Sequence, residues 1–418
     1  MKTHFLFITL FISALCFAQQ DSLPTITKPE TVGMSTEGLN KIRPLMQKYV
    51  DDNKLPGMVT IAARHGKAVF FESYGVMYKN KPMQKDAIFR IASMTKPVTS
   101  VAVMILFDEG RLKLDDPVSM YIPEFGNLKV LSSIDKDGVH LLPQNRPMTI
   151  RNLLMHTSGL ASGGGDSPID SIYKAANLSA GTLKDMIQKL ADIPLLYQPG
   201  TRWNYSRSSD VLAYLVEVVS GKRFDVFLKE RIFDPLGMKD CGYSIPLEKL
   251  DRATSVYSPG DSTGIKTVME HDADYSSTPV KFFAGNGGLV ATAADYMTFA
   301  QMLLNKGEYN GRRILKTKTV ELMTSNHITS EIMPDDDFFG SLLAGMGFGF
   351  GMAVLNDNSK TNNIGSAGSY WWSGSANTYF YVDPREDLVL IFMTQFVPNF
   401  YYPVFKEFRE LTYKSIIK

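Results

Sequence analysis

The chain has few cysteines and no excess of either charge. Two cysteines occur among 418 residues, so the fold depends on its hydrophobic core rather than on a disulfide framework. Lysine and arginine number 44 against 43 aspartates and glutamates, which gives no strong field toward nucleic acid or an acidic membrane. We therefore expect a protein that binds no nucleic acid and acts on a small molecule or peptide.

The sequence also lacks a long apolar segment after its first residues. Lys2 is followed by an apolar stretch over residues 5–17 and by the small residue Ala18. This order is typical of a secretory signal peptide over residues 1–18, which predicts an exported protein, periplasmic or secreted. A membrane anchor is the alternative, but the stretch is shorter than the about 20 residues that a spanning helix needs. We expect no transmembrane segment in the mature chain.

Metal chemistry and cysteine chemistry are not indicated either. The six histidines show no metal-ligand spacing, so we expect no metal and no other cofactor. Once the signal peptide is removed, Cys241 is the last thiol, and no histidine stands near it in sequence to activate it. We interpret Cys241 as an ordinary small residue.

Strand-like segments stand near both ends of the chain. Residues 57–63 and 68–71 flank a tight turn at His65 and Gly66. Residues 378–382 and 388–393 flank a second turn near the C-terminus. Each pair predicts an antiparallel hairpin, because the connections are too short for a parallel crossover.

The region between the hairpins has mostly helical periodicity. Helices are expected at residues 36–50 behind the capping residue Ser35, at 208–219, and at 402–417. We predict an α+β fold in which one antiparallel sheet, built from both chain ends and flanked by helices, accepts a mostly helical insertion. The expected domains are an α/β sheet domain from residues 19–110 and 281–418, and a mostly helical domain from residues 111–280.

Ser93 and Lys96 stand at the start of an apolar helix that Gly110 ends. Pro97 is tolerated only in the first turn of a helix, so this helix must begin close to Ser93. The hydroxyl and the amine then lie one turn apart on the same face. A buried lysine can take the proton of a serine nucleophile, and the helix N-terminus favours the negative charge that develops. Alone, however, Ser-x-x-Lys is a common chance pattern.

A longer series of motifs resembles the serine β-lactamase and penicillin-binding-protein superfamily, and within it the class C-like branch that includes family VIII carboxylesterases. Ser93 and Lys96 match the first motif of that superfamily, Ser-x-x-Lys. Tyr205 aligns with the catalytic tyrosine of the second motif, Tyr-x-Asn or a variant. Further stretches match at residues 153–160, 287–292 and 376–395, so the resemblance extends over almost the whole mature chain.

The third motif of the superfamily is Lys-Thr-Gly or a substitute. Trp372, Ser373 and Gly374 are the matching residues here, and the resemblance implies that they line the substrate site. It also implies an oxyanion hole made by the backbone N–H groups of Ser93 and Ser375. Such paired donors are each worth a few kcal/mol when they are preorganised.

Two residues depart from the pattern of the superfamily. Arg207 stands where the superfamily often has asparagine, which puts the usual contact to a substrate amide in doubt. It could supply a charge to the substrate or be a structural arginine. Trp372 replaces the lysine that helps to hold a substrate carboxylate, and its apolar ring favours neutral esters.

The resemblance implies a serine hydrolase that cleaves ester bonds, with amide bonds as the second choice, through a Ser93 acyl-enzyme, and the signal peptide adds the expectation of export. Lys96 and Tyr205 are the implied general base and acid, and the sequence leaves open which of them is the primary base. The alternatives are a β-lactamase or D-alanyl-D-alanine carboxypeptidase and, less favoured, a non-catalytic penicillin-recognition-like module. A Ser–His mechanism through His156 is a further rival, but the matching motif of the superfamily is structural.

Overall fold

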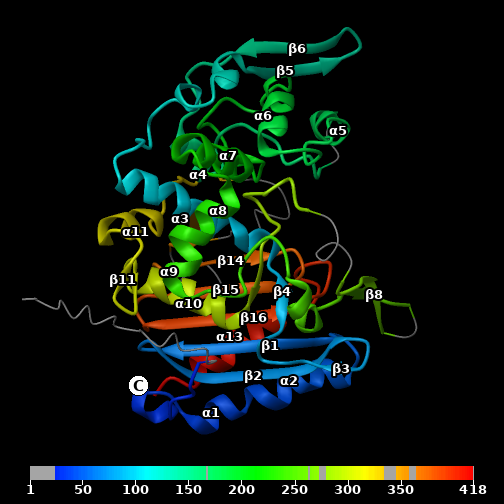
Figure 1. Ribbon diagram of the computed structural model, residues 1–418, viewed down its shortest axis with the longest axis vertical. Coiled ribbons are helices and arrows are strands. Elements are labelled where there is room, and N and C mark those ends of the chain that lie inside the picture. Colours follow the sequence, from blue (N-terminus) through cyan, green and yellow to red (C-terminus); the bar gives the residue numbers. More distant parts are fainter. Residues whose placement is uncertain are drawn as a thin grey trace, which may run out of the picture.

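A computed structural model describes residues 24–165, 168–261, 264–272, 279–333, 345–356 and 364–417. The expected signal peptide, residues 1–18, lies outside these residues. An eight-stranded antiparallel sheet forms the base of the molecule, with strands in the order β12-β13-β14-β15-β16-β1-β2-β3 (Figure 1). Its strands are β1 (Gly57–Arg64), β2 (Lys67–Tyr78), β3 (Lys81–Pro82), β12 (Met346–Phe348), β13 (Ala353–Leu355), β14 (Tyr370–Gly374), β15 (Thr378–Asp383) and β16 (Leu388–Thr394).

The two predicted hairpins are confirmed as β1–β2 and β15–β16, and they meet in the centre of the sheet. β16 pairs antiparallel with β1, with Ile391 opposite Ile61. The strands therefore come from both ends of the chain, as the sequence predicts. The turn between β15 and β16 is fixed by Asp383, whose Oδ1 accepts hydrogen bonds from the backbone N–H groups of Arg385 at 2.9 Å and Glu386 at 3.2 Å.

Helices cover both faces of the sheet (Figure 1). On one face lies α10 (Ala293–Leu304), whose Tyr296 ring is 5.3 Å from that of Phe380 on β15. On the other face lie α2 (Ile42–Asp51) and α13 (Val404–Lys414), where Phe405 stacks on Tyr379 at 4.4 Å. Because successive strand residues point to opposite faces, Tyr379 and Phe380 mark the two sides of the sheet.

The helix predicted at residues 36–50 is divided into α1 (Thr36–Asn40) and α2. Ser35 caps the first of these by accepting a hydrogen bond from the Gly38 N–H at 3.0 Å. The division falls at Lys41, shortly before Pro44. Proline has no N–H to continue the hydrogen-bond ladder, which explains the interruption.

The remaining helices lie mainly between β4 (Ile88–Arg90) and β9 (Val290–Thr292) in sequence, and several of them form the upper part of the molecule in Figure 1. The central one, α3 (Thr95–Asp108), is buried over most of its length and packs against α7 (Ser208–Ser220). The others are α4 (Ile150–Leu154), α5 (Pro168–Ala175), α6 (Leu183–Ala191), α8 (Phe224–Leu228), α9 (Asp234–Leu236) and α11 (Thr317–Met323).

The described residues also form four small two-stranded sheets: β4 (Ile88–Arg90) with β9 (Val290–Thr292), β5 (Lys129–Asp135) with β6 (Gly138–Pro143), β7 (Val256–Pro259) with β8 (Ile265–Met269), and β10 (Glu308–Tyr309) with β11 (Arg312–Arg313). Within the residues described, no helix combines the length and the apolar character needed to cross a membrane.

Candidate active site

Ser93 lies in a short 3-10 turn, Ala92–Met94, between β4 and α3. Ala92 has φ of 45°, in the left-handed region that residues with a Cβ seldom adopt. The turn is fixed on its far side by Tyr296, whose hydroxyl donates to the Met94 carbonyl at 2.8 Å. A strained backbone thus holds the candidate nucleophile at the junction of strand and helix.

Lys96 lies in the first turn of α3, and 2% of its surface is exposed. Its Nζ donates to Ser93 Oγ at 3.2 Å and to the backbone carbonyl of Asn286 at 2.7 Å. Pro97 follows within the first turn, where the lost N–H costs no helical hydrogen bond. The structure therefore brings the predicted serine and lysine into direct contact.

The half-buried ring of Tyr205 lies beside the same amine, with its centroid 4.4 Å from Lys96 Nζ. It precedes α7 and is enclosed by aromatic rings: His156 at 5.0 Å, Trp372 at 5.6 Å and Trp203 at 6.2 Å between centroids. These rings fix the orientation of the tyrosine. Lys96 is therefore contacted by residues from three parts of the sequence: Ser93, Tyr205 and Asn286.

His156 packs against the ring of Tyr205. It is 1% exposed, and its Nδ1 accepts a hydrogen bond from the Ser206 N–H at 3.3 Å. Burial, followed by the nearby positive charge of Lys96, lowers the pKa of His156 well below its ordinary value. The imidazole is thus neutral, with its proton on Nε2.

β14 carries the third motif past the nucleophile. Trp372 is 4% exposed and faces Tyr205, whereas Ser373 pairs with Tyr379 on the opposite side of the sheet. The Ser373 hydroxyl accepts a hydrogen bond from Asn399 Nδ2 at 3.1 Å. Alternation along the strand therefore directs the Trp372 ring, and not the Ser373 hydroxyl, toward the tyrosine.

Gly374 brings β14 close to the segment that precedes Ser93. A Cβ at Gly374 would stand 2.3 Å from the Ile91 carbonyl oxygen, so only glycine allows this approach. Thr378 reinforces the contact by donating to the same carbonyl at 3.2 Å. The exposed Ser375 follows in the turn after β14.

Arg207 points into the helical part of the molecule. Its Nη1 lies 3.2 Å from Oδ2 of Asp210, and its Nε donates to the Ser162 carbonyl at 3.3 Å. Asp210 is fully buried, and its Oδ1 accepts a hydrogen bond from the Asn286 N–H at 2.9 Å. Sequence reasoning did not identify Asp210 or Asn286, although an aspartate on the buried face of an apolar helix is a signal that could have found the former.

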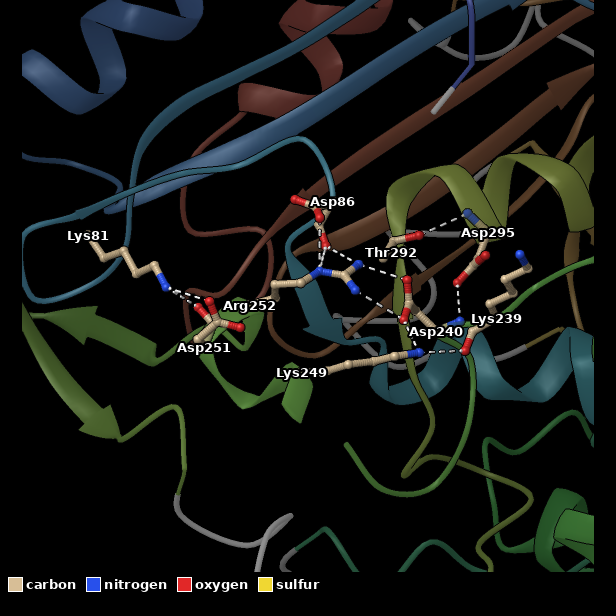
Figure 2. Close-up of polar contacts among 9 residues, drawn as sticks. All are labelled: Lys81, Asp86, Lys239, Asp240, Lys249, Asp251, Arg252, Thr292 and Asp295. Atoms are coloured by element: carbon tan, nitrogen blue, oxygen red, sulfur yellow. Dashed lines mark hydrogen bonds and ion pairs between the residues drawn. The ribbon is translucent and has the colours of Figure 1, made fainter. Parts of the chain in front are cut away.

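A second charged cluster is centred on the segment after α9, at Asp240, Lys249 and Arg252 (Figure 2). Arg252 bridges Asp86 at 3.0 Å and Asp240 at 2.7 Å, and Lys249 also binds Asp240 at 2.8 Å. Burial opposes the charged form of Asp240, but the hydrogen bonds from Arg252 and Lys249 outweigh it and lower the pKa. Burial, followed by the charge of Asp240, raises the pKa of Asp295 to about 7.

Cys241 lies beside this cluster, at a cavity of about 400 Å³. Burial, followed by the charges of Asp295 and Asp240, raises the pKa of the Cys241 thiol well above its ordinary value. The thiol form is a weak nucleophile, so these surroundings do not favour cysteine chemistry.

Residues 260–264 have the Gly-x-Ser-x-Gly form of a nucleophile elbow. The two glycines flank the connection between β7 and β8, and the Gly260 N–H donates to the Gly264 carbonyl at 2.8 Å. A nucleophile elbow joins a strand to a helix, whereas this segment joins two strands. Its context is therefore that of a hairpin.

Comparison with known proteins identifies the family of the chain. The sequence profile of the Beta-lactamase family matches residues 42–408. The chain belongs to the Beta-lactamase family. Protein Rv1367c of Mycobacterium tuberculosis is 34% identical over 363 residues, which cover 85% of this chain and 89% of that protein. Esterase EstB of Burkholderia gladioli is 28% identical over 373 residues, which cover 82% of this chain and 86% of that protein.

The fold is also found among solved structures. EstCE1, a hydrolase with promiscuous acyltransferase activity, matches with a TM-score of 0.76 at 24% identity, over 90% of this chain and 99% of that chain. The large antiparallel sheet with flanking helices is thus the β-lactamase and transpeptidase fold. Family membership and the esterase relative identify this Beta-lactamase family member as a serine hydrolase.

Proposed function

We propose that the protein is an exported esterase that cleaves carboxylic esters through an acyl-enzyme on Ser93. The observation that carries the proposal is the contact of 3.2 Å between the buried Lys96 Nζ and Ser93 Oγ. A serine hydroxyl is a poor nucleophile unless a base takes its proton, and this amine is within reach of that proton.

The proposed reaction has two halves. Ser93 Oγ attacks the ester carbonyl while Lys96 and Tyr205 accept its proton, and the N–H groups of Ser93 and Ser375 bind the oxyanion. Tyr205 then protonates the departing alcohol, which leaves an ester of Ser93. Water, deprotonated by the same pair, attacks this ester and releases the acid, and the proton returns to Ser93 Oγ. Lys96 Nζ lies 4.4 Å from the Tyr205 ring centroid, so the two residues are close enough to act together.

The side chains near Lys96 favour a neutral substrate. Trp372 offers an apolar ring where a lysine would bind a carboxylate. The guanidinium of Arg207 is bonded to Asp210 and Ser162, which engages its charge within the protein. Esterase EstB, a relative over most of the chain, is consistent with an ester substrate. A β-lactam or a D-alanyl peptide, each with a free carboxylate, fits these side chains less well.

Export is proposed from the sequence of residues 1–18, with cleavage after Ala18. Expression of the full chain with N-terminal sequencing of the product tests this point. A mature N-terminus at Gln19 is expected, and an intact Met1 terminus on an intracellular product would contradict it.

Hydrolysis of p-nitrophenyl butyrate by the mature protein, with Ser93→Ala alongside, tests the esterase proposal. We expect activity in the parent and a loss of at least about 1,000-fold in the variant. Activity that survives in Ser93→Ala would refute the nucleophile. Parallel assays with a chromogenic β-lactam and a D-alanyl-D-alanine peptide distinguish the alternatives, and faster turnover of either than of the ester would reassign the substrate.

A further inference from the structure

The carbonyl that binds Lys96 belongs to a segment held by several distant residues. This segment, residues 284–289, runs between the nucleophile turn and the first turn of α7. The Tyr243 hydroxyl donates to the Ala284 carbonyl at 2.7 Å, and the Thr99 hydroxyl donates to the Gly285 carbonyl at 2.7 Å. At its other end, the Ile91 N–H donates to the Leu289 carbonyl at 3.0 Å.

Asn286 is the point at which this segment joins two charged groups. Its carbonyl accepts from Lys96 Nζ at 2.7 Å, and its N–H donates to Asp210 Oδ1 at 2.9 Å. Gly285 permits this geometry, since a Cβ there would stand 2.0 Å from the Ser209 carbonyl oxygen. The backbone of residue 286 thus links a buried carboxylate to the amine beside Ser93.

Asp210 is well placed to fix that link. It is fully buried at the third residue of α7, and its two oxygens are directed to different partners, Asn286 and Arg207. A local role at the helix start explains the contact with Arg207, but it does not require a hydrogen bond from Asn286, which lies 76 positions further along the chain. A charged acceptor on the N–H also polarises the peptide and strengthens its carbonyl as an acceptor.

We propose that Asp210 is a positioning residue that acts through the Asn286 peptide to hold the Lys96 amine against Ser93. This inference rests on the proposed function of Ser93 and Lys96. The carboxylate fixes the peptide plane, the peptide carbonyl fixes one hydrogen bond of the amine, and the amine then donates another hydrogen bond to Ser93 Oγ.

The charges around Lys96 come from few elements among the described residues. Asp210 and Arg207 lie at the start of α7, His156 follows α4, and Tyr205 precedes α7. His156 is neutral because of its burial, and Arg207 is paired with Asp210. Burial raises the pKa of Asp210, and the charge of Arg207 and the hydrogen bond from the Asn286 N–H oppose that rise.

The test compares Asp210→Asn with Asp185→Asn. Asp185 occupies the equivalent third residue of α6, where its contacts stay within the helix start at Thr182. Steady-state kinetics on p-nitrophenyl butyrate and urea unfolding are measured for both. We expect kcat to fall by about 10- to 100-fold in Asp210→Asn with KM little changed, because the amine is misplaced while the substrate site is intact. Asp185→Asn is expected to keep kcat.

The split between kcat and KM separates positioning from a structural role. A displaced amine lowers kcat and leaves KM little changed, whereas a distorted substrate site raises KM as well. The double variant Arg207→Gln/Asp210→Asn avoids a guanidinium facing an amide, and it repeats the test if the single variant does not fold. An unchanged kcat, or a lower kcat together with a raised KM, overturns the inference. Inactive Ser93→Ala in the same assay shows that the proposed function stands even then.

Discussion

Substitution of Gly374 by alanine probes how closely β14 must approach the nucleophile turn. The added Cβ would lie 2.3 Å from the Ile91 carbonyl oxygen and 2.3 Å from Thr378 Oγ1. Ordinary non-bonded contacts are near 3.5 Å, so the strand and the Ile91 segment must separate by about 1 Å. Ser375, one residue further, moves with the strand. Its N–H then leaves the position proposed for the oxyanion.

The expected costs in stability and in activity differ. Overpacking of this kind lowers the free energy of unfolding by about 1–3 kcal/mol, which leaves a protein of ordinary stability folded. Loss of one oxyanion donor lowers kcat by about 10²- to 10³-fold. Unfolding therefore cannot account for the predicted loss of activity.

Urea unfolding and steady-state hydrolysis of p-nitrophenyl butyrate measure the two effects on the same preparation. Gly126→Ala is the matched control, because a Cβ there meets its nearest neighbour, Ser119, at 3.9 Å. It should change neither quantity. If Gly374→Ala keeps kcat within about twofold of the parent, the oxyanion position assigned to Ser375 is wrong.

Three further substitutions test the energetics of the fold. Ala92→Gly should raise the free energy of unfolding by up to about 1 kcal/mol, because glycine adopts the left-handed φ of 45° without strain. A lower free energy of unfolding, measured with urea, would refute strain at this turn. Asp295 has its pKa raised from 3.8 to about 7, so its contribution to stability is full below pH 3.8 and is lost as the pH rises through 7. Asp295→Asn should therefore flatten the fall in melting temperature between pH 4 and pH 7, and an unaltered slope would contradict the burial argument. Thr99→Val removes the hydroxyl that donates to the buried Gly285 carbonyl at 2.7 Å, and it should lower the free energy of unfolding in urea by about 1–3 kcal/mol. An unchanged free energy of unfolding would mean that another donor replaces the hydroxyl.

Features that depend on neighbouring residues could be predicted from the sequence. The β1–β2 and β15–β16 hairpins follow from alternation around a short turn, and both are confirmed. The contact between Ser93 and Lys96 follows from their separation of one helical turn. By contrast, the division of the first helix at Lys41 requires the position of Pro44 to be weighed against a continuous apolar pattern.

Contacts between distant backbone groups could not be predicted in this way. The bond from Asn286 to Asp210 uses a backbone N–H, which every residue but proline possesses, so the identity of residue 286 carries no signal. The opposite directions of Trp372 and Ser373 were predictable in principle, because alternation along a strand is regular. Which of the two faces Tyr205 required the tertiary structure.

The candidate site depends on three close approaches of backbone rather than on a rigid loop of its own. Gly374 admits β14 to the Ile91 carbonyl, Gly285 admits its segment to α7, and Ala92 accepts a strained turn so that Ser93 meets Lys96. The first two join segments that are distant in sequence, whereas the turn at Ala92 is local. A change that loosens any one of them should therefore lower kcat before it lowers stability appreciably, because proton transfer requires the reacting groups within about 3 Å of each other.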